Sequence, residues 1–329
     1  MTDIRIHSLK DLPTEHLLGA GTAMCAGCGG LETVHQVHDL TGGRTVFVNA
    51  AGCMTLLANW PFTPFRGGFL YTSMASAAAG AQGVRDALDI LIAKGRIPPE
   101  EDMATVVLAG DGSSYGMGLS ATSSAIERGL DFLYVCYDNE GYGNTGQQTS
   151  EATPFAARTA TEAAGMGHTG WKKDLFGIWA AHGPAYAATA IAAEPLDLAR
   201  KVERAMHTKG PRLILALAPC PTGWGYDPKD TVEIGRLAVR TGIFPLKEYT
   251  DGRVTHTKIP RPRLPVEDYL ATQQRFRHLF APQRQDAAIA RIQQAVDAYW
   301  APIEAAATGA SPEAVAQAPA DAGANRPST

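Results

Sequence analysis

Short apolar, β-branched segments alternate with longer amphipathic segments along the first two thirds of the chain. Short apolar runs bounded by turn residues are typical of buried strands, and longer periodic segments are typical of helices. The strands expected on this basis are 45–49, 104–109, 132–137, 185–189 and 212–218. The helices expected between them are 30–40, 74–94, 117–128, 173–182 and 196–208. This order predicts a doubly wound α/β fold, in which helices cover both faces of a mainly parallel sheet.

Two regions depart from this alternation. Residues 139–170 are polar and rich in glycine, and a stretch of that length inside a compact domain is usually functional or unstructured. Residues 226–282 are rich in Pro and Arg and indicate an extension that wraps around a partner rather than a second core. We therefore expect three parts, which are an α/β domain (1–245), a C-terminal extension with the helix 283–300 at a subunit interface (246–302), and a flexible Ala/Pro-rich tail (303–329).

Composition narrows the class of protein. The 329 residues are 45% hydrophobic and carry a formal net charge of −4, with basic residues scattered, which argues against a nucleic-acid partner. No apolar run approaches the roughly 20 residues of a membrane helix, and the first 17 residues lack the apolar region of a secretion signal. We therefore expect a cytoplasmic protein. In that reducing compartment, five cysteines favour metal or cluster ligation over a disulfide framework.

A Gly-Asp-Gly turn at 110–112 follows one predicted strand, and Asn139 follows the next. Because a crossover helix joins these strands, both should be parallel and end at the same edge of the sheet, where such folds bind ligands. In neighbouring strands, the oxygens of Asp111 and Asn139 would lie roughly 5 Å apart. That arrangement suits two ligands of an Mg²⁺ ion that also holds phosphate oxygens. The Gly-Asp-Gly turn alone has a purely conformational explanation, but its pairing with Asn139 favours a diphosphate and metal site.

Four cysteines are expected at the same edge of the sheet. Cys25 and Cys28 form a C-x-x-C pair, while Cys53 and Cys220 each follow a predicted strand. Such a set can hold an iron–sulfur cluster or a structural zinc ion. A redox-active C-x-x-C, or buried apolar roles for Cys53 and Cys220, are further alternatives that the residues leave open. Cys136 lies inside a predicted strand and is expected to be a core residue.

Together these motifs resemble the β subunit of pyruvate:ferredoxin oxidoreductase and related enzymes. The resemblance extends over residues 18–246. It is carried by five motifs in the family's order, which are Cys-x-x-Cys-Gly (25–29), Gly-Cys (52–53), Gly-Asp-Gly (110–112), Tyr-Asp-Asn-Glu-Gly-Tyr-Gly-Asn-Thr-Gly (137–146) and Ala-Pro-Cys-Pro-Thr-Gly-Trp (218–224). It implies a fold of the thiamine-diphosphate-binding type, and three cofactors: thiamine diphosphate, Mg²⁺ and a [4Fe-4S] cluster.

The resemblance also implies roles for individual residues. The cluster ligands would be Cys25, Cys28, Cys53 and Cys220. The Mg²⁺ ligands would be the side chains of Asp111 and Asn139 and the carbonyl of Gly141. The other residues at the cofactor would be Gly52, Cys53, Leu56, Gly110, Gly112, Ser113, Asn144 and Thr145. Of these, Asn144 would lie beside the thiazolium and the substrate as a catalytic residue.

The family resemblance further implies a multi-subunit enzyme. An α subunit would supply the activating glutamate and the substrate-specificity residues, and γ and ferredoxin-like δ subunits would complete the complex. The reaction would be oxidative decarboxylation of a 2-oxoacid to acyl-CoA and CO₂, with electrons passing through the cluster to ferredoxin or an NAD-linked subunit. Competing hypotheses are a non-redox thiamine-diphosphate lyase or transferase with structural zinc, and a non-catalytic electron-transfer subunit.

Two details bear on specificity and on the histidines. Residues 59–65 read Asn-Trp-Pro-Phe-Thr-Pro-Phe, where relatives acting on pyruvate carry a Tyr-Pro-Tyr-like segment. This bulky stretch indicates either a larger or aromatic 2-oxoacid, such as phenylglyoxylate, or a different subunit interface, with equal support. Among the histidines, His35 and His38 are expected at the surface, and His168 and His182 are expected in capping or packing roles.

Overall fold

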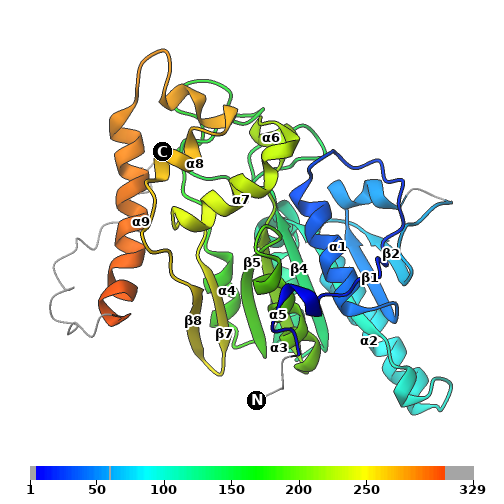
Figure 1. Cartoon of the computed structure of the whole chain (residues 1–329). Coiled ribbons are helices and arrows are strands. Elements are labelled where there is room, and N and C mark those ends of the chain that lie inside the picture. The colour runs from blue at the N-terminus through cyan, green and yellow to red at the C-terminus, as the bar shows by residue number, and fades with distance from the viewer. Residues whose placement is uncertain (1–4, 59–60, 308–329) are drawn as a thin grey trace.

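The structure, a computed structural model, describes residues 5–58 and 61–307 of the chain. An eight-stranded sheet runs through these residues (Figure 1). Its strands are β1 (Thr45–Ala50), β2 (Gly68–Thr72), β3 (Ala104–Gly110), β4 (Phe132–Asp138), β5 (Tyr186–Ile191), β6 (Pro211–Leu217), β7 (Leu246–Thr250) and β8 (Arg253–Lys258). Their order is β2-β1-β3-β4-β6-β5-β7-β8, and only the pairings of β7 with β5 and β8 are antiparallel. The predicted mainly parallel, doubly wound sheet is confirmed.

Helices cover both faces of the sheet. One face carries α1 (Gly29–Thr41) and α5 (Pro195–His207), and the other carries α2 (Ala77–Ala93), α3 (Leu119–Glu127) and α4 (Leu175–Ala181). Successive side chains of a strand point to opposite faces, so that Phe47 packs in the α1/α5 core and Val48 in the α2/α3/α4 core. Strands buried on both faces in this way explain the near-continuous apolar runs in the sequence.

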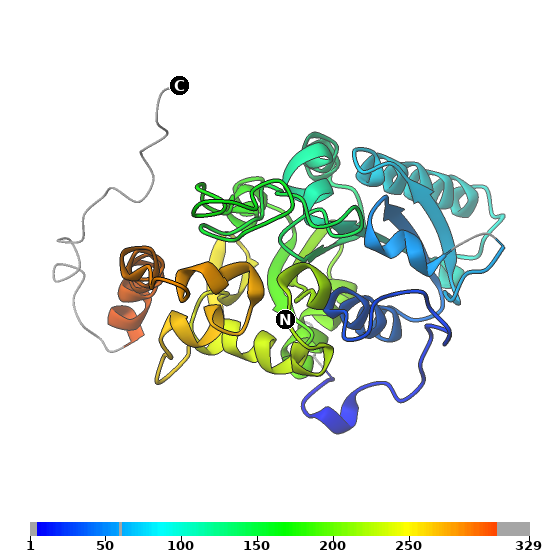
Figure 2. The same cartoon turned by 90° about the horizontal axis from the view of Figure 1, so that it is seen from above.

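The C-terminal part of the described chain adds to the sheet and builds a third core. Its helices are α6 (Pro221–Trp224), α7 (Thr231–Arg240), α8 (Val266–Leu270) and α9 (Asp286–Ala307). Figures 1 and 2 show α9 on the opposite side of the molecule from α2. The segment 226–282, expected to wrap around a partner rather than form a second independent core, contributes β7, β8 and buried side chains such as Phe276 and Leu279. Helix α9 runs on into the predicted tail, of which 308–329 lie outside the described residues.

Short helical turns connect the larger elements. The 3₁₀ turns are η1 (Leu9–Asp11), η2 (Cys53–Leu57), η3 (Pro99–Glu101), η5 (Pro228–Asp230) and η6 (Gln274–Leu279). Between β3 and α3 the chain forms a π-helical turn, η4 (Gly112–Met117). Turns of that kind often occur at functional sites. None of the helices in the described residues is long and apolar enough to span a membrane.

One expectation about the histidines is wrong. His38 is fully buried rather than at the surface, and its ring packs against Phe47 and Phe65 at centroid distances of 4.7 and 5.6 Å. Its Nε2 accepts a hydrogen bond from the backbone N–H of Arg66. Burial lowers the pKa of His38, so the neutral imidazole is the form that the fold favours.

Candidate functional site

Two neighbouring strands bring the predicted metal ligands together. Strands β3 and β4 pair in parallel with Gly110 opposite Tyr137, so the residues that follow them meet at one edge of the sheet. The side-chain oxygen of Asn139 lies 2.8 Å from Oδ1 of Asp111 and 2.7 Å from the carbonyl oxygen of Gly141. Three oxygens with no proton between them repel one another unless the amide rotates or a cation lies among them. This carboxylate, amide and carbonyl set is the kind of oxygen set that Mg²⁺ binds.

The environment of Asp111 also calls for a positive charge. Its side chain is buried, and its Oδ2 accepts a hydrogen bond from the Ser150 hydroxyl. Burial raises the pKa of Asp111 well above its usual value, and the nearby carboxylate of Asp138 adds to the effect. A buried carboxylate is costly to ionise without a compensating cation. The site is therefore suited to a divalent cation and poorly suited to an empty, ionised state.

A cavity of about 190 Å³, hereafter the cofactor cavity, opens beside these oxygens. The predicted site residues that line it are Gly52, Cys53, Gly110, Asp111, Gly112, Ser113, Asn139, Gly141, Asn144 and Thr145. Further lining residues that the sequence did not single out include Tyr71, Met74 and Tyr142. A Cβ atom at Gly112 would lie 2.1 Å from the Tyr142 ring, so this tight approach requires glycine. No other residue type fits at the start of η4 without moving that ring.

The four cysteines surround a second space, of about 170 Å³, hereafter the cysteine cavity. Cys28 and Cys220 are the N-cap residues of α1 and α6, where their Sγ atoms accept backbone N–H groups at 3.4 and 3.3 Å. Cys25 lies in the loop before α1, and Cys53 begins η2. Leu56, predicted at the cofactor, lines this cavity and not the cofactor cavity. Cys136 is fully buried inside β4, as expected for a core residue.

Two of the thiols, Cys28 and Cys53, lie close to other cysteines and are poorly hydrated, whereas Cys25 is exposed. Burial raises the pKa of Cys28 to about 11 and that of Cys53 to about 12, and Cys220 raises both further. Such thiols stay protonated unless a metal supplies positive charge. The sulfurs are nevertheless not tightly clustered. In the described residues, the only three metal-ligating groups within 4.8 Å of one another are His16, His35 and Asp39.

The two cavities share a wall. Cys53, Tyr137, Asn139, Gly143 and Asn144 line both of them. Nδ2 of Asn139 lies 3.8 Å from Sγ of Cys53, so an expected Mg²⁺ ligand contacts an expected cluster ligand directly. A cofactor in one cavity and a cluster in the other would therefore be separated by little more than one layer of side chains.

A buried ion network holds the residues on either side of Asn139. Nζ of Lys172 lies 2.6 Å from Oδ2 of Asp138 and 2.9 Å from Oε1 of Glu140. The Tyr115 hydroxyl donates to the same Asp138 oxygen at 2.6 Å. Although burial opposes it, the two carboxylates raise the pKa of Lys172, which stays charged. Burial still raises the pKa of Asp138, whose ionised form depends on Lys172.

Glu140 has a backbone conformation that few non-glycine residues adopt, with φ of 61°. Its polar atoms are all engaged: Lys172 and Arg275 each bond one carboxylate oxygen, Asp138 accepts its N–H, and the Thr153 hydroxyl donates to its carbonyl. Against burial, the two cations hold its pKa below the usual value. Such a conformation persists where several surrounding contacts hold it in place. It turns the chain so that its two neighbours in sequence face the cofactor cavity.

Arg275 is a functional residue that the sequence did not reveal. It comes from η6, 135 residues away from Glu140, and bonds Oε2 of that residue at 2.6 Å. Its guanidinium lies 3.9 Å from the centroid of the Trp224 ring, whose Nε1 donates to the carbonyl of Asn139 at 2.8 Å. No spacing or periodicity in the sequence links these residues, because each contact joins segments far apart in the chain.

His168 and His182 make structural contacts. Nδ1 of His182 lies 2.8 Å from the carbonyl of Ile178 at the C-terminal end of α4, and its Nε2 lies 2.7 Å from the Ser123 hydroxyl. His168 pairs with Glu162 at 2.8 Å. Neither histidine lines the cofactor cavity or the cysteine cavity. The expected capping and packing roles agree with these contacts.

Comparisons with known proteins point to one family. Residues 50–216 match the family described as thiamine pyrophosphate enzyme, C-terminal TPP binding domain. The chain is 42% identical over 293 residues to pyruvate synthase subunit PorB of Methanocaldococcus jannaschii, covering 88% of this chain and 97% of that protein. It is 38% identical over 275 residues to ketoisovalerate oxidoreductase subunit VorB of Pyrococcus abyssi, covering 82% and 88%.

A solved structure shares the fold. A chain of the 2-oxoglutarate:ferredoxin oxidoreductase from Magnetococcus marinus superposes with a TM-score of 0.55 at 20% identity. The match covers 84% of this chain and 94% of that one. At that level of identity the likeness concerns the fold alone, and it agrees with the mainly parallel sheet described above.

Proposed function

Because this chain belongs to the family of β subunits of 2-oxoacid:ferredoxin oxidoreductases, we propose that it forms half of the active site of such an enzyme. In this proposal the cofactor cavity holds thiamine diphosphate and Mg²⁺, and the cysteine cavity holds a [4Fe-4S] cluster. The observation that carries the proposal is the shared wall, where Asn139 contacts Cys53. A decarboxylation centre and an electron acceptor need that proximity, whereas two unrelated sites do not.

The oxygen set supports Mg²⁺ as the cation. The side chains of Asp111 and Asn139 and the carbonyl of Gly141 converge without a hydrogen between them. In the proposed site Asn139 keeps its oxygen toward the cation, while its nitrogen faces Cys53. The N–H groups at the start of η4 and the close approach allowed at Gly112 suit the diphosphate. When bound, thiamine diphosphate supplies the carbanion chemistry and the cluster takes up electrons.

The spacing of the sulfurs favours a cluster over zinc. Four sulfurs around one zinc ion at about 2.3 Å would lie within roughly 4 Å of one another. No three of the cysteine sulfurs come within 4.8 Å of one another in the described residues. A cubic cluster instead separates its four cysteine ligands around a larger body, as the cysteine cavity allows. We therefore propose iron–sulfur ligation by Cys25, Cys28, Cys53 and Cys220.

The chain's own residues would orient the reactants and exclude water. Asn144 lines both cavities and would lie beside the reacting centre, and Thr145 and Ser113 would bind the diphosphate. Leu56, on the cysteine side of the shared wall, would separate cofactor and cluster. No glutamate lines either cavity in the described residues. We propose that a partner α subunit supplies the activating carboxylate, alongside γ and ferredoxin-like δ subunits.

We propose a 2-oxoacid as substrate, with coenzyme A as acyl acceptor and ferredoxin or an NAD-linked subunit as electron acceptor. Identity to PorB ranges from 37% in Thermotoga maritima to 44% in Methanothermobacter thermautotrophicus, and identity to VorB of Pyrococcus abyssi is 38%, so the two ranges overlap and identity alone does not select the acid. Phe62, in the bulky segment 59–65, is 79% exposed, and residues 61–65 line neither cavity. We therefore propose that residues 61–64 lie at a subunit interface and do not select an aromatic acid.

The first test uses the purified complex with Asp111→Ala. We expect loss of bound thiamine diphosphate and Mg²⁺ but an unchanged cluster signal in electron paramagnetic resonance after dithionite reduction. Asp227→Ala, which removes an exposed carboxylate, is the control and should retain thiamine diphosphate, Mg²⁺ and the cluster signal. Metal analysis that finds zinc and no iron would overturn the redox proposal in favour of a lyase or transferase. Retention of thiamine diphosphate by the variant would mean that Asp111 is not its metal ligand.

The second test identifies the substrate. The intact complex is assayed with pyruvate, 2-oxoisovalerate, 2-oxoglutarate and phenylglyoxylate, with coenzyme A and a viologen dye. Reduction of the dye that depends on coenzyme A and on one of these acids is expected. Absence of dye reduction with every acid, in a complex that contains both cofactors, would favour the non-catalytic alternative.

A further inference from the structure

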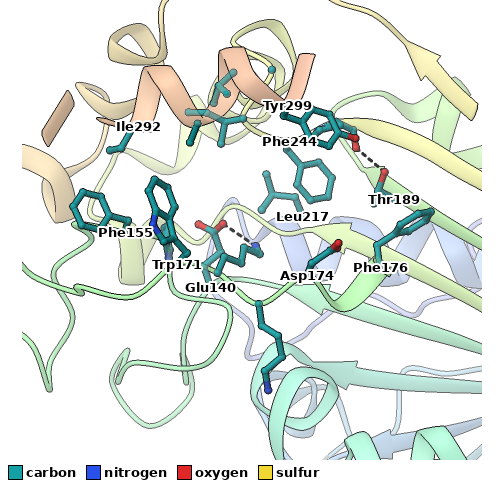
Figure 3. A pocket seen from close by; sticks show the side chains of 18 of the residues that line it. Glu140, Phe155, Trp171, Asp174, Phe176, Thr189, Leu217, Phe244, Ile292 and Tyr299 are labelled. Atoms are coloured by element: carbon teal, nitrogen blue, oxygen red, sulfur yellow. Dashed lines mark hydrogen bonds and ion pairs between the residues drawn. The ribbon is translucent and has the colours of Figure 1, made fainter. Parts of the chain in front are cut away.

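A third cavity, of about 420 Å³ and hereafter the α9 cavity, lies beside Glu140 (Figure 3). Glu140 is the middle residue of the segment 139–141, hereafter the metal loop. Glu140 lines the α9 cavity, whereas Asn139 and Gly141 line the cofactor cavity on the other side of the same segment. Its other walls include α9, the start of α4 and the approach to β7, with further side chains from β5, β6, α8, η6 and the loop before α4. The volume falls within the roughly 300–1,000 Å³ typical of small-molecule sites. The family's proposed chemistry uses neither this space nor the residues at its centre.

The walls are mostly apolar and aromatic. Figure 3 shows Phe244, Leu217 and Ile292 around a common space, with Phe176 and Tyr299 at one end. Apolar walls with few polar groups are the usual lining of a pocket that binds a small molecule with an apolar body.

One cation stands out among these walls. Nζ of Lys247 lies 4.5 Å from the centroid of the Phe176 ring and 5.3 Å from that of Tyr299. In the described part of the chain, no carboxylate pairs with this ammonium and no hydrogen bond engages it. Two aromatic faces stabilise a cation only modestly compared with a hydrogen-bonded carboxylate. Burial lowers the pKa of Lys247, as expected of an ammonium that has lost water without gaining a counter-ion.

A second cation lies at the rim. The rings of Phe155 and Trp171 stack at 5.1 Å, and the guanidinium of Arg291 lies 4.6 and 5.5 Å from their centroids. Trp171 is 44% exposed, which places this rim at the surface. An anion that enters from solvent on this side would meet a stacked aromatic pair and a positive charge. Both features favour entry of an apolar anion.

The other charged groups at the walls are already engaged. Lys172 pairs with Glu140, and Nζ of Lys173 donates to the backbone carbonyl of Tyr115 at 2.5 Å. Asp174 accepts the N–H of Gly177 at the start of α4 and is exposed to solvent. Its charge weakens the positive field at the Lys247 ammonium but does not pair with it. The cavity therefore has one ammonium available for a ligand, in an apolar setting.

We propose that the α9 cavity binds a small carboxylic acid with an apolar aliphatic or aromatic body. The carboxylate would meet the Lys247 ammonium, and the body would fill the space beneath α9. This assignment stands apart from the proposed function, because it uses none of the residues expected to bind thiamine diphosphate, Mg²⁺ or the cluster. Neutral or cationic molecules of the same shape would leave Lys247 without its partner and should bind less tightly.

The test measures binding to the purified complex by titration calorimetry at pH 7.5. The probes are octanoate and 4-phenylbutyrate, with 4-phenylbutan-1-ol as the neutral counterpart. We expect one saturable site per chain for at least one acid, with a dissociation constant on the order of 1 mM or lower. The Lys247→Met variant should weaken acid binding by about 10- to 100-fold and leave binding of the alcohol unchanged. The better acid tells whether an aliphatic or an aromatic body is preferred.

Three further variants make the result decisive. Lys209→Met, at an exposed lysine paired with Asp131, should bind like the wild type. Ala295→Trp, which fills the cavity from α9, should abolish binding of both acids, and it decides the matter if Lys247→Met fails to assemble. Asp111→Ala should retain binding, which excludes the cofactor cavity as the site. No saturable binding, equal binding to Lys247→Met, or loss in Asp111→Ala would each overturn the proposal.

Discussion

Replacing Arg275 with methionine tests whether the C-terminal region supports the metal loop. Nη2 of Arg275 lies 2.6 Å from Oε2 of Glu140, and the two side chains are 3% and 6% exposed. Removing one partner of a buried ion pair costs about 3–5 kcal/mol, because the other charge is left without compensation. Lys172 still bonds the other oxygen of Glu140, so we expect the lower end, about 3 kcal/mol. Methionine keeps an apolar contact with Trp224, which isolates the effect of the charge.

The measurement is a double-mutant cycle by chemical denaturation, with Glu140→Gln as the second change. Removing both partners should cost clearly less than the sum of the single changes, with a coupling energy of at least about 1.5 kcal/mol. Arg284→Met is the matched control, since Arg284 pairs with Glu267 in solvent, with side chains 44% and 40% exposed. Little change is expected there. Additive losses, or a loss at Arg275 no larger than at Arg284, would refute the reasoning.

Two further predictions concern the loop that holds Cys25 and Cys28 and the pH dependence of folding stability. Gly27→Ala should reduce iron per chain while thiamine diphosphate is retained, because φ is +66° and the new Cβ would lie 2.4 Å from the carbonyl oxygen of Pro228. Gly165→Ala, with φ of +60° and open space around it, should keep its iron; equal loss in both would mean that backbone strain alone is responsible. Burial lowers the pKa of His38, so its full contribution to the free energy of unfolding is present above about pH 6.5. That contribution is lost at lower pH, because the unfolded chain gains a proton more readily than the folded one. His38→Gln should flatten the stability profile below about pH 6.5, and parallel profiles would contradict this.

The architecture could be predicted wherever strands are buried on both faces. Strands β1, β3, β4, β5 and β6 have the continuous apolar runs that such burial requires, and all were expected from the sequence. Strand β2 was not, because it lies at an edge and reads Gly-Phe-Leu-Tyr-Thr with half-exposed side chains. Strands β7 and β8 are mostly polar. The Asp251-Gly252 turn between them, with both φ values positive, was a hairpin signal that the sequence did contain.

Those residues of the candidate site that lie next to the ends of strands could be predicted from the sequence. The predicted residues line two adjoining cavities, because parallel strands end at one edge of the sheet. Their separate roles stay predictions. The support behind them, above all Arg275 and Lys172, could not be inferred, since a buried ion pair between distant segments leaves no periodic trace. Which cavity Leu56 lines could not be inferred either, because it depends on how η2 turns.

The contact between Glu140 and Arg275 can form only late in the synthesis of this chain. The two residues are 135 positions apart, and a ribosome adds about 5–20 residues per second. The metal loop therefore waits roughly 7 to 27 s after its own synthesis before its second cation emerges. During that interval the Glu140 carboxylate has one of its two cations, Lys172, while Asp138 and Thr153 hold its backbone. The full set of contacts to Glu140 therefore exists only in chains that have been synthesised through η6.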